Sequence, residues 1–308
     1  MKATLFCLAL LIFSGCAKPS EQYAGRLVYT HEARTIRLCD EEQSYWLQAE
    51  GSIHQRLQTE YLNLIAENYQ QVYLEFSGRP VESVAEFAAD YAGTLQLEAI
   101  ETLSARIPAD CVGETSGDWT LLHATPAAHT YVFNCDNELT FTARTDRQSV
   151  WLFLPTGTLQ LPQTATGHYA KEGAEFQLVG EQARLKTAER ELQCSNDRPA
   201  AIWEHAKLNG ADFRAIGNEP GWNLEIRQQS ELILISEYGA KRQLFELPQP
   251  IIDSANRTTR YQIEQPESLR LTIRGENCRD SMSGEPFESQ VEIEFDGKTL
   301  QGCGKALH

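Results

Sequence analysis

The sequence predicts an all-β protein, with one helix in its first domain, built from three small domains that are each a disulfide-stapled β-barrel or sandwich. Three observations support this. Most of the chain consists of short runs of alternating apolar and polar residues separated by turns, which is the pattern of half-buried strands. The length of 308 residues leaves room for two or three small domains. The cysteines are spaced so that neighbours along the chain can close one bridge in each domain.

The chain is strongly acidic. Its 27 Lys and Arg residues against 43 Asp and Glu residues give a formal net charge of −16. Nucleic acids and anionic lipid surfaces are therefore poor partners, whereas a basic protein is attracted from a distance.

The first residues read as an export signal. Lys2 is followed by an apolar run over 3–13, which is too short to cross a bilayer, and then by Ser14, Gly15 and Cys16. Small residues directly before a cysteine resemble a bacterial lipobox. This resemblance implies that Cys16 is the lipidated first residue of the mature protein.

We therefore expect a signal peptide over 1–15 and a lipidated tether over 16–22. The acyl chains would anchor the protein stably in a membrane. Ala17, rather than Asp, after the lipid cysteine favours the outer membrane of a bacterial cell envelope, facing the periplasm. The alternative is ordinary secretion with Cys16 as a free thiol.

The cysteines indicate disulfide bonds. Of the eight, Cys7 falls in the signal peptide and Cys16 carries the lipid, which leaves an even number in an exported chain. Six cysteines allow many connectivities, and pairing in sequential order gives one bridge per domain. The expected bridges are Cys39–Cys111, Cys135–Cys194 and Cys278–Cys303. Each would contribute roughly 3–5 kcal/mol in the chain-entropy model.

Residues 23–112 read as three strands, a helix and two further strands, which is the order of a small OB-type barrel. Ser52 is expected to cap the helix, and Ile53, Leu57 and Tyr61 lie on one apolar stripe. The frame YAG…THEARTIRLC…YWL…LQTEY…VYLEFSG resembles the C-terminal OB domain of NlpE-type envelope lipoproteins. No basic or aromatic stripe accompanies the expected OB face, so we expect no nucleic-acid partner.

Residues 117–198 carry the most specific pattern. The stretch LPQTATGHYAKEGAEFQLVGEQARL, over 161–185, reads as strand, tight glycine loop, strand, glycine turn and strand. The longer pattern YVFNCDNELTFTAR…VWLFLPTGTLQLPQTATGHYAKEGAEFQLVGEQARL…LQC resembles the MliC family, the membrane-bound inhibitors of c-type lysozyme. Its landmarks match in order: a cysteine after an aromatic strand, Leu-Pro before the loop, small-Gly-x-Tyr in it, G-x-x-A after it, and a second cysteine.

The resemblance implies a way to inhibit a lysozyme. A c-type lysozyme works with two carboxyl groups in an open cleft, and the family blocks them with a loop serine and with a lysine before the following glycine. Here Thr166 supplies the hydroxyl, Gly167 and Tyr169 complete the loop, and Val179 stands in place of the lysine. Losing one member of such a charge pair costs on the order of 2–5 kcal/mol of binding. Lys171 is a conceivable substitute cation.

Two interpretations of the TATGHY loop stay open. In the first, Thr166, Gly167 and Tyr169 insert into the cleft of a c-type lysozyme or another basic muramidase. In the second, the loop is only a turn whose Gly167 is there for backbone reasons. The protein is then a structural or sensory envelope lipoprotein without lysozyme inhibition.

The third domain follows NDRPAAIWEHAKLNG, which reads as a linker with a short helical turn. Residues 212–308 contain further short alternating runs, and GNEPGW and CRDSMSGEPF…GCG resemble an uncharacterised domain of bacterial envelope proteins. Glu219, Trp222 and Asp280 mark a possible ligand site or, less favoured, an enzyme site. The two acids are flanked by turn residues, which is also typical of side chains that cap tight loops.

Known catalytic signatures do not occur in the chain. It has no GxSxG elbow, HExxH zinc helix, Walker loop or dinucleotide-binding glycine fingerprint. The seven histidines are scattered, and His123 and His129 have a poor spacing for a metal site. We therefore expect a protein that is not an enzyme and that uses no cofactor or metal.

Overall fold

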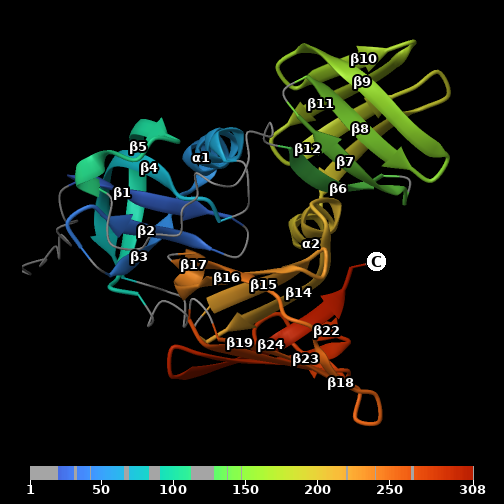
Figure 1. Ribbon diagram of the computed structural model, residues 1–308. Helices are drawn as coiled ribbons and strands as arrows, with labels where there is room; N and C mark the ends of the chain where they lie inside the picture. Colours follow the sequence, from blue (N-terminus) through green and yellow to red (C-terminus); the bar gives the residue numbers. More distant parts are fainter. Residues whose placement is uncertain are drawn as a thin grey trace, which may run out of the picture.

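The computed structural model describes residues 20–30, 33–41, 43–65, 69–82, 91–111, 128–136, 138–146, 148–219, 221–239, 241–264 and 267–307. The described chain is mostly β-structure, folded into two closed barrels and one open, strongly curved sheet, and each of the three carries one disulfide (Figure 1). The expected fold class is confirmed. The signal peptide over 1–15 and the lipidated Cys16 lie outside the described residues. No helix in the described part is long and apolar enough to cross a bilayer.

The first domain is a five-stranded closed barrel with one helix. Its elements are β1 (Glu21–Tyr29), β2 (Arg34–Leu38), β3 (Ser44–Gln48), α1 (Gly51–Leu64), β4 (Val72–Val81) and β5 (Thr94–Ser104), arranged in the order β1-β2-β3-β5-β4. The apolar stripe of α1 packs against the core of the barrel, with Leu57 and Tyr61 fully buried. The expected cap is wrong by two positions, because the helix begins after Glu50 and Ser52 lies inside its first turn. The Cys39–Cys111 disulfide pairs as expected.

The middle domain is an eight-stranded closed barrel in which all neighbouring strands are antiparallel. Its strands are β6 (His129–Cys135), β7 (Thr140–Thr145), β8 (Ser149–Leu154), β9 (Gly157–Ala165), β10 (His168–Lys171), β11 (Ala174–Val179), β12 (Gln182–Lys186) and β13 (Glu191–Asn196). Residues of alternating positions fill the interior, among them Phe133 and Phe176, whose rings meet edge to face. Cys135 and Cys194 are direct cross-strand partners of β6 and β13, and their disulfide pairs as expected.

The third domain is a nine-stranded antiparallel sheet that curls into a half-barrel without closing. Its strands lie in the order β17 (Lys241–Glu246), β16 (Glu231–Ser236), β15 (Gly221–Arg227), β14 (Ala211–Asn218), β24 (Lys298–Ala306), β23 (Ser289–Phe295), β20 (Leu269–Arg274), β19 (Thr258–Ile263) and β18 (Ile251–Asp253). A two-stranded sheet of β21 (Cys278–Arg279) and β22 (Pro286–Phe287) lies beside β24, and Cys278 is bridged to Cys303 as expected.

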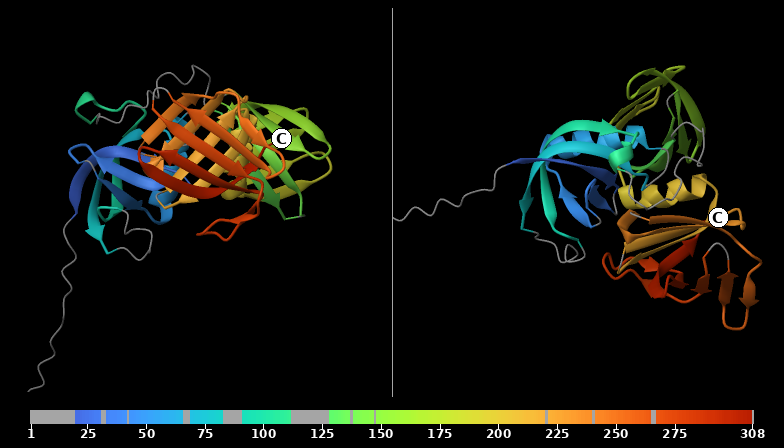
Figure 2. Two further views of the ribbon diagram at one scale, coloured as in Figure 1. Left: turned by 60° about the horizontal axis from the view of Figure 1, so that its bottom comes forward. Right: turned by 60° about the vertical axis from the view of Figure 1, so that its left-hand side comes forward.

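The helix α2 (Arg198–Leu208) lies where the domains meet, with the middle barrel on one side, the half-barrel on the other and the first domain beside both (Figures 1 and 2). The sequence predicts only a short helical turn here, whereas the structure has a helix of 11 residues. Its buried residues, Ala201, Ile202, Trp203 and Ala206, are not confined to one stripe. A helix that packs on two domains buries more than one face, which weakens the periodic signal that identifies helices.

A chain of hydrogen bonds fastens α2 to the middle barrel. The Arg144 guanidinium donates to Oδ1 of Asn209 at 2.7 Å, which fixes the orientation of that amide. The Asn209 amide then donates to Nε2 of His205 at 2.8 Å, and Nδ1 of His205 lies 3.2 Å from the Thr130 hydroxyl. Because Nε2 must accept and Nδ1 must donate, only the neutral ring of His205 satisfies both neighbours.

The first domain packs directly on the half-barrel. Val28, Ala33 and Tyr69 form an apolar cluster with Ile233 and Ile235 of β16, and all five are almost completely buried. Burial of this kind is favourable in proportion to the apolar area removed from water. The three domains are therefore parts of one packed body rather than separate modules on flexible linkers.

Candidate functional site

The predicted inhibitor loop is a tight hairpin turn. Thr166 and Gly167 connect β9 to β10, and Gly167 has a φ of +69°, in the left-handed region that favours glycine. A Cβ atom at this position would lie 2.5 Å from the carbonyl oxygen of Leu178. The Leu178 N–H donates to the carbonyl oxygen of Gly167 at 2.7 Å. Gly167 therefore has a backbone reason to be glycine, because the turn is pressed against the end of β11.

The same contact places Val179 beside the turn. Val179 is the last residue of β11 and is 65% exposed, and Thr166 is exposed in the turn itself. Each lies one position away from the hydrogen-bonded pair of Gly167 and Leu178. The structure thus brings Thr166, Gly167 and Val179 together at one end of the barrel.

Tyr169 does not share this surface. Its side chain is only 5% exposed and lies in the barrel core, with its ring centroid 6.1 Å from that of Phe176. Burial raises the pKa of the Tyr169 phenol, and the nearby carboxylate of Asp146 raises it further. Tyr169 therefore stabilises the barrel beneath the turn, and the side chain that the turn itself presents is that of Thr166.

The alternative cation, Lys171, lies at the wrong end of the hairpin. It is the last residue of β10, paired with Ala174 across the next turn, whereas the Thr166–Gly167 turn precedes the first residue of that strand. Its ammonium lies 3.7 Å from the carboxylate of Glu172. Lys171 therefore does not supply the charge that Val179 lacks.

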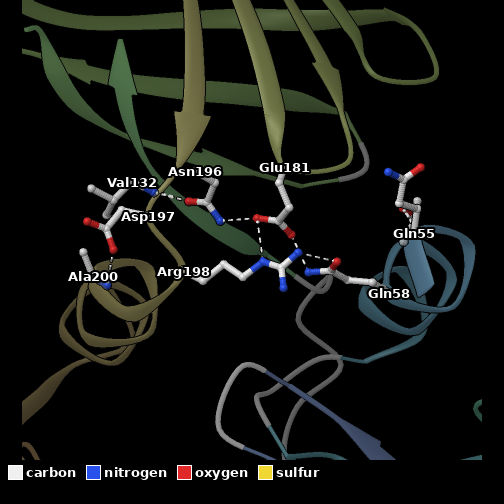
Figure 3. A network of polar contacts seen from close by, with 9 residues as sticks. Gln55, Gln58, Val132, Glu181, Asn196, Asp197, Arg198 and Ala200 are labelled. Carbon is white, nitrogen blue, oxygen red and sulfur yellow. Dashed lines mark hydrogen bonds and ion pairs between the residues drawn. The ribbon is translucent and has the colours of Figure 1, made fainter. Parts of the chain in front are cut away.

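Two residues beyond Val179, a polar junction joins the middle barrel to the first domain and to α2 (Figure 3). The Glu181 carboxylate lies 3.2 Å from Nε of Arg198 and accepts hydrogen bonds from the side-chain amides of Gln58 and Asn196. The Arg198 guanidinium also donates to the Gln58 carbonyl oxygen at 2.6 Å. Glu181 and Arg198 are each mostly buried, so the pair is less screened than a surface ion pair.

Sequence reasoning missed this junction. Gln58 is separated from Glu181 by 123 positions and from Arg198 by 140, so no local motif could reveal it. The junction also affects access to the predicted inhibitor surface. Through Glu181, the hairpin turn that follows Val179 is held against α1 and the start of α2, whereas Thr166 and Val179 stay exposed.

In the third domain, the structure places Trp222 inside the half-barrel. Its side chain is 4% exposed and packs with Leu224 in the main core. The indole covers Gly217 and Gly302, where an added Cβ would lie 2.2 Å and 2.7 Å from its ring atoms. Glu219 is exposed on the turn between β14 and β15. Trp222 and Asp280 nevertheless both line one cleft of about 440 Å³ beside the start of α2, whereas Glu219 does not line it.

Asp280 holds its own loop. Its Oδ1 accepts hydrogen bonds from the N–H groups of Met282 and Ser283 and from the Ser283 hydroxyl, and its Oδ2 accepts one from the Asn218 amide at 2.6 Å. Burial acts to raise the pKa of Asp280, but these hydrogen bonds outweigh it and hold the pKa below its usual range. This is the loop-capping role that its sequence context favours.

No model of a known protein family matches this sequence, and no curated protein matches it significantly. The described residues contain no group of three or more His, Cys, Asp or Glu side chains that could hold a metal ion.

Proposed function

We propose that this protein is a non-enzymatic lipoprotein of the bacterial envelope whose middle barrel binds a c-type lysozyme or another basic muramidase. The observation that carries the proposal is the adjacency of the exposed Thr166 and Val179 at one end of the barrel, fixed by the contact between Gly167 and Leu178. A rigid tip loses little conformational entropy when it enters a cleft. The MliC-like order of landmarks supports the choice of partner.

In this proposal the Thr166 hydroxyl enters the cleft and makes hydrogen bonds to the catalytic carboxyl groups. A hydroxyl can donate to an ionised carboxylate and accept from a protonated one, so it suits both members of such a pair. The net charge of −16 would speed encounter with a basic enzyme. Val179 adds apolar contact but no charge, so we expect weak inhibition.

A second candidate is a structural or sensory envelope lipoprotein that does not inhibit lysozyme. The junction of Glu181, Arg198 and Gln58 favours it, because it ties the barrel to the other two domains beside the predicted inhibitor surface. In this case the tight turn at Gly167 serves only to close the barrel.

An inhibition assay with the purified, oxidised protein and a c-type lysozyme separates the two. Inhibition at micromolar protein that Thr166→Arg removes supports the first candidate, because the longer arginine side chain would clash where the threonine hydroxyl enters the cleft. Thr156→Arg is the matched control, since Thr156 is an exposed threonine at the other end of β9. Absence of inhibition, or equal loss in both variants, contradicts the lysozyme-binding proposal.

A further inference from the structure

A cleft of about 440 Å³ lies between the first domain and the half-barrel, beside the start of α2. Its volume is in the range of small-molecule sites. Trp46 and Tyr91 line it from the first domain, with ring centroids 5.8 Å apart and a tilt of 59°. Exposed Pro199 and Met282 form part of its rim, so the cleft is open to solvent.

The floor of the cleft holds a buried amide. Asn223 lies on β15, between Trp222 and Leu224, whose side chains fill the half-barrel core, so its own side chain points to the opposite face of the sheet. Its cross-strand neighbours on that face are Ile216 and Ile235, which also line the cleft. Asn223 is 5% exposed as a residue, and it lines the cleft, so its side-chain amide can pair with a ligand there.

This amide limits what the cleft can hold. A ligand that displaces water from this amide without replacing its hydrogen bonds loses binding free energy. A purely apolar ligand would leave the Asn223 amide unpaired. A strongly anionic ligand would face the carboxylates of Asp280 and Glu285, and a cationic one would face the Arg34 guanidinium, all of which line the cleft. The favoured ligand is therefore uncharged overall and carries both apolar surface and hydroxyl or amide groups.

We propose that the cleft binds a neutral saccharide. A pyranose ring has C–H faces that pack on aromatic rings, here those of Trp46 and Tyr91, and a rim of hydroxyl groups that can donate to and accept from the Asn223 amide. Arg34 lies at the same border of the first domain and offers further donors. This site is independent of the hairpin tip on the middle barrel.

The test measures binding of cellotetraose and of N-acetylchitotetraose to the purified protein by calorimetry and tryptophan fluorescence. We expect at least one of them to bind saturably with a Kd of about 1 mM or tighter. Asn223→Leu keeps the shape of the side chain but removes the amide, and Trp46→Ala removes an aromatic wall; each is expected to weaken binding by about tenfold or more. Trp151→Ala, on β8 of the middle barrel, is the matched control and should leave binding unchanged.

Three results would overturn the saccharide site. One is the absence of saturable binding of both sugars at about 10 mM. Another is binding that survives both Asn223→Leu and Trp46→Ala. The third is tighter sugar binding in Asn223→Leu than in the unchanged protein, which would identify an apolar site. Unfolding temperature and circular dichroism of each variant verify that it is folded before its binding is compared.

Discussion

Gly167 and Gly173 occupy successive turns of the same hairpin region, and both have positive φ, but only Gly167 is pressed against another strand. For Gly173 nothing lies within 4 Å of an added Cβ, so Gly173→Ala meets backbone strain alone, roughly 1–2 kcal/mol. Gly167→Ala meets the same strain and also a collision with the carbonyl of Leu178, which adds about 1–3 kcal/mol.

Hydrogen exchange of the barrel amides measures this difference, because it reports the local free energy of opening. We expect Gly167→Ala to lower protection in β10 and β11 more than Gly173→Ala does. Equal loss in the two variants would show that the close approach to Leu178 is not what requires glycine at position 167.

Val179 is the residue at which the proposed lysozyme binding can be strengthened. It is 65% exposed beside the turn, so Val179→Lys places a cation there without disturbing the core. If the barrel binds a lysozyme through this end, the new ammonium can pair with the ionised catalytic carboxylate and should tighten inhibition at least about tenfold, or about 1.4 kcal/mol. Thr156→Lys adds the same charge at the other end of β9 and should have no such effect. Equal behaviour of the two variants would contradict the predicted binding mode.

For single residues, the sequence predicts which side chains belong to the hairpin turn better than it predicts which of them are exposed. The order of landmarks placed Thr166, Gly167 and Val179 in one region, and the structure brings them together. The sequence pattern does not reveal that Tyr169 is buried, because a single aromatic residue after a turn can lie on either face of a strand. The packing of Tyr169 on Phe176 depends on the register between β10 and β11.

At the scale of the element, α2 shows how one side chain can start a helix between two domains. Asp197 precedes the helix, and its Oδ1 accepts a hydrogen bond from the Ala200 N–H at 3.1 Å. We expect Asp197→Ala to destabilise the protein by about 0.5–2 kcal/mol, because that N–H loses its partner. Asp197→Asn keeps an acceptor and should cost much less. Denaturant unfolding of both variants measures the difference, and equal costs would show that the cap is unimportant.

The strands were easier to predict than this helix. Each strand of the barrels has one face to the core, so its period of two is visible in runs such as those at 129–135 and 175–180. The sheet order was not predictable in the same way. The half-barrel pairs β14 with β24, from opposite ends of the third domain, and no local pattern encodes such a pairing.

At the scale of the molecule, two partly buried histidines should make the assembly sensitive to acid. Burial lowers the pKa of His205 to about 3, with Arg144, His129, Arg227 and Arg214 acting in the same direction, and burial lowers the pKa of His129 to about 4. An unfolded histidine titrates near 6.5. Below about pH 6.5 the unfolded chain therefore binds protons that the folded chain does not.

Stability should thus be full above about pH 6.5 and decline as the pH falls towards the lowered pKa values. The slope can reach about 1.4 kcal/mol per pH unit for each histidine. Urea unfolding between pH 7 and pH 5 measures this decline in the free energy of unfolding. We expect His205→Gln to make the decline shallower. His168→Gln, at an exposed position, is the control and should leave the decline unchanged. An identical pH dependence in all three proteins would exclude His205 as its cause.

A single residue, Asp197, separates β13 from α2, and this has a mechanical consequence. Its N–H donates to the Val132 carbonyl oxygen at 2.7 Å while its carboxylate caps the helix, so both sides of the connection are held. A torque applied to the middle barrel passes through this joint into α2 and then into β14, which the helix contacts. A molecule that pulls on the hairpin tip would therefore also rotate the half-barrel, because the connection between β13 and α2 contains no flexible segment.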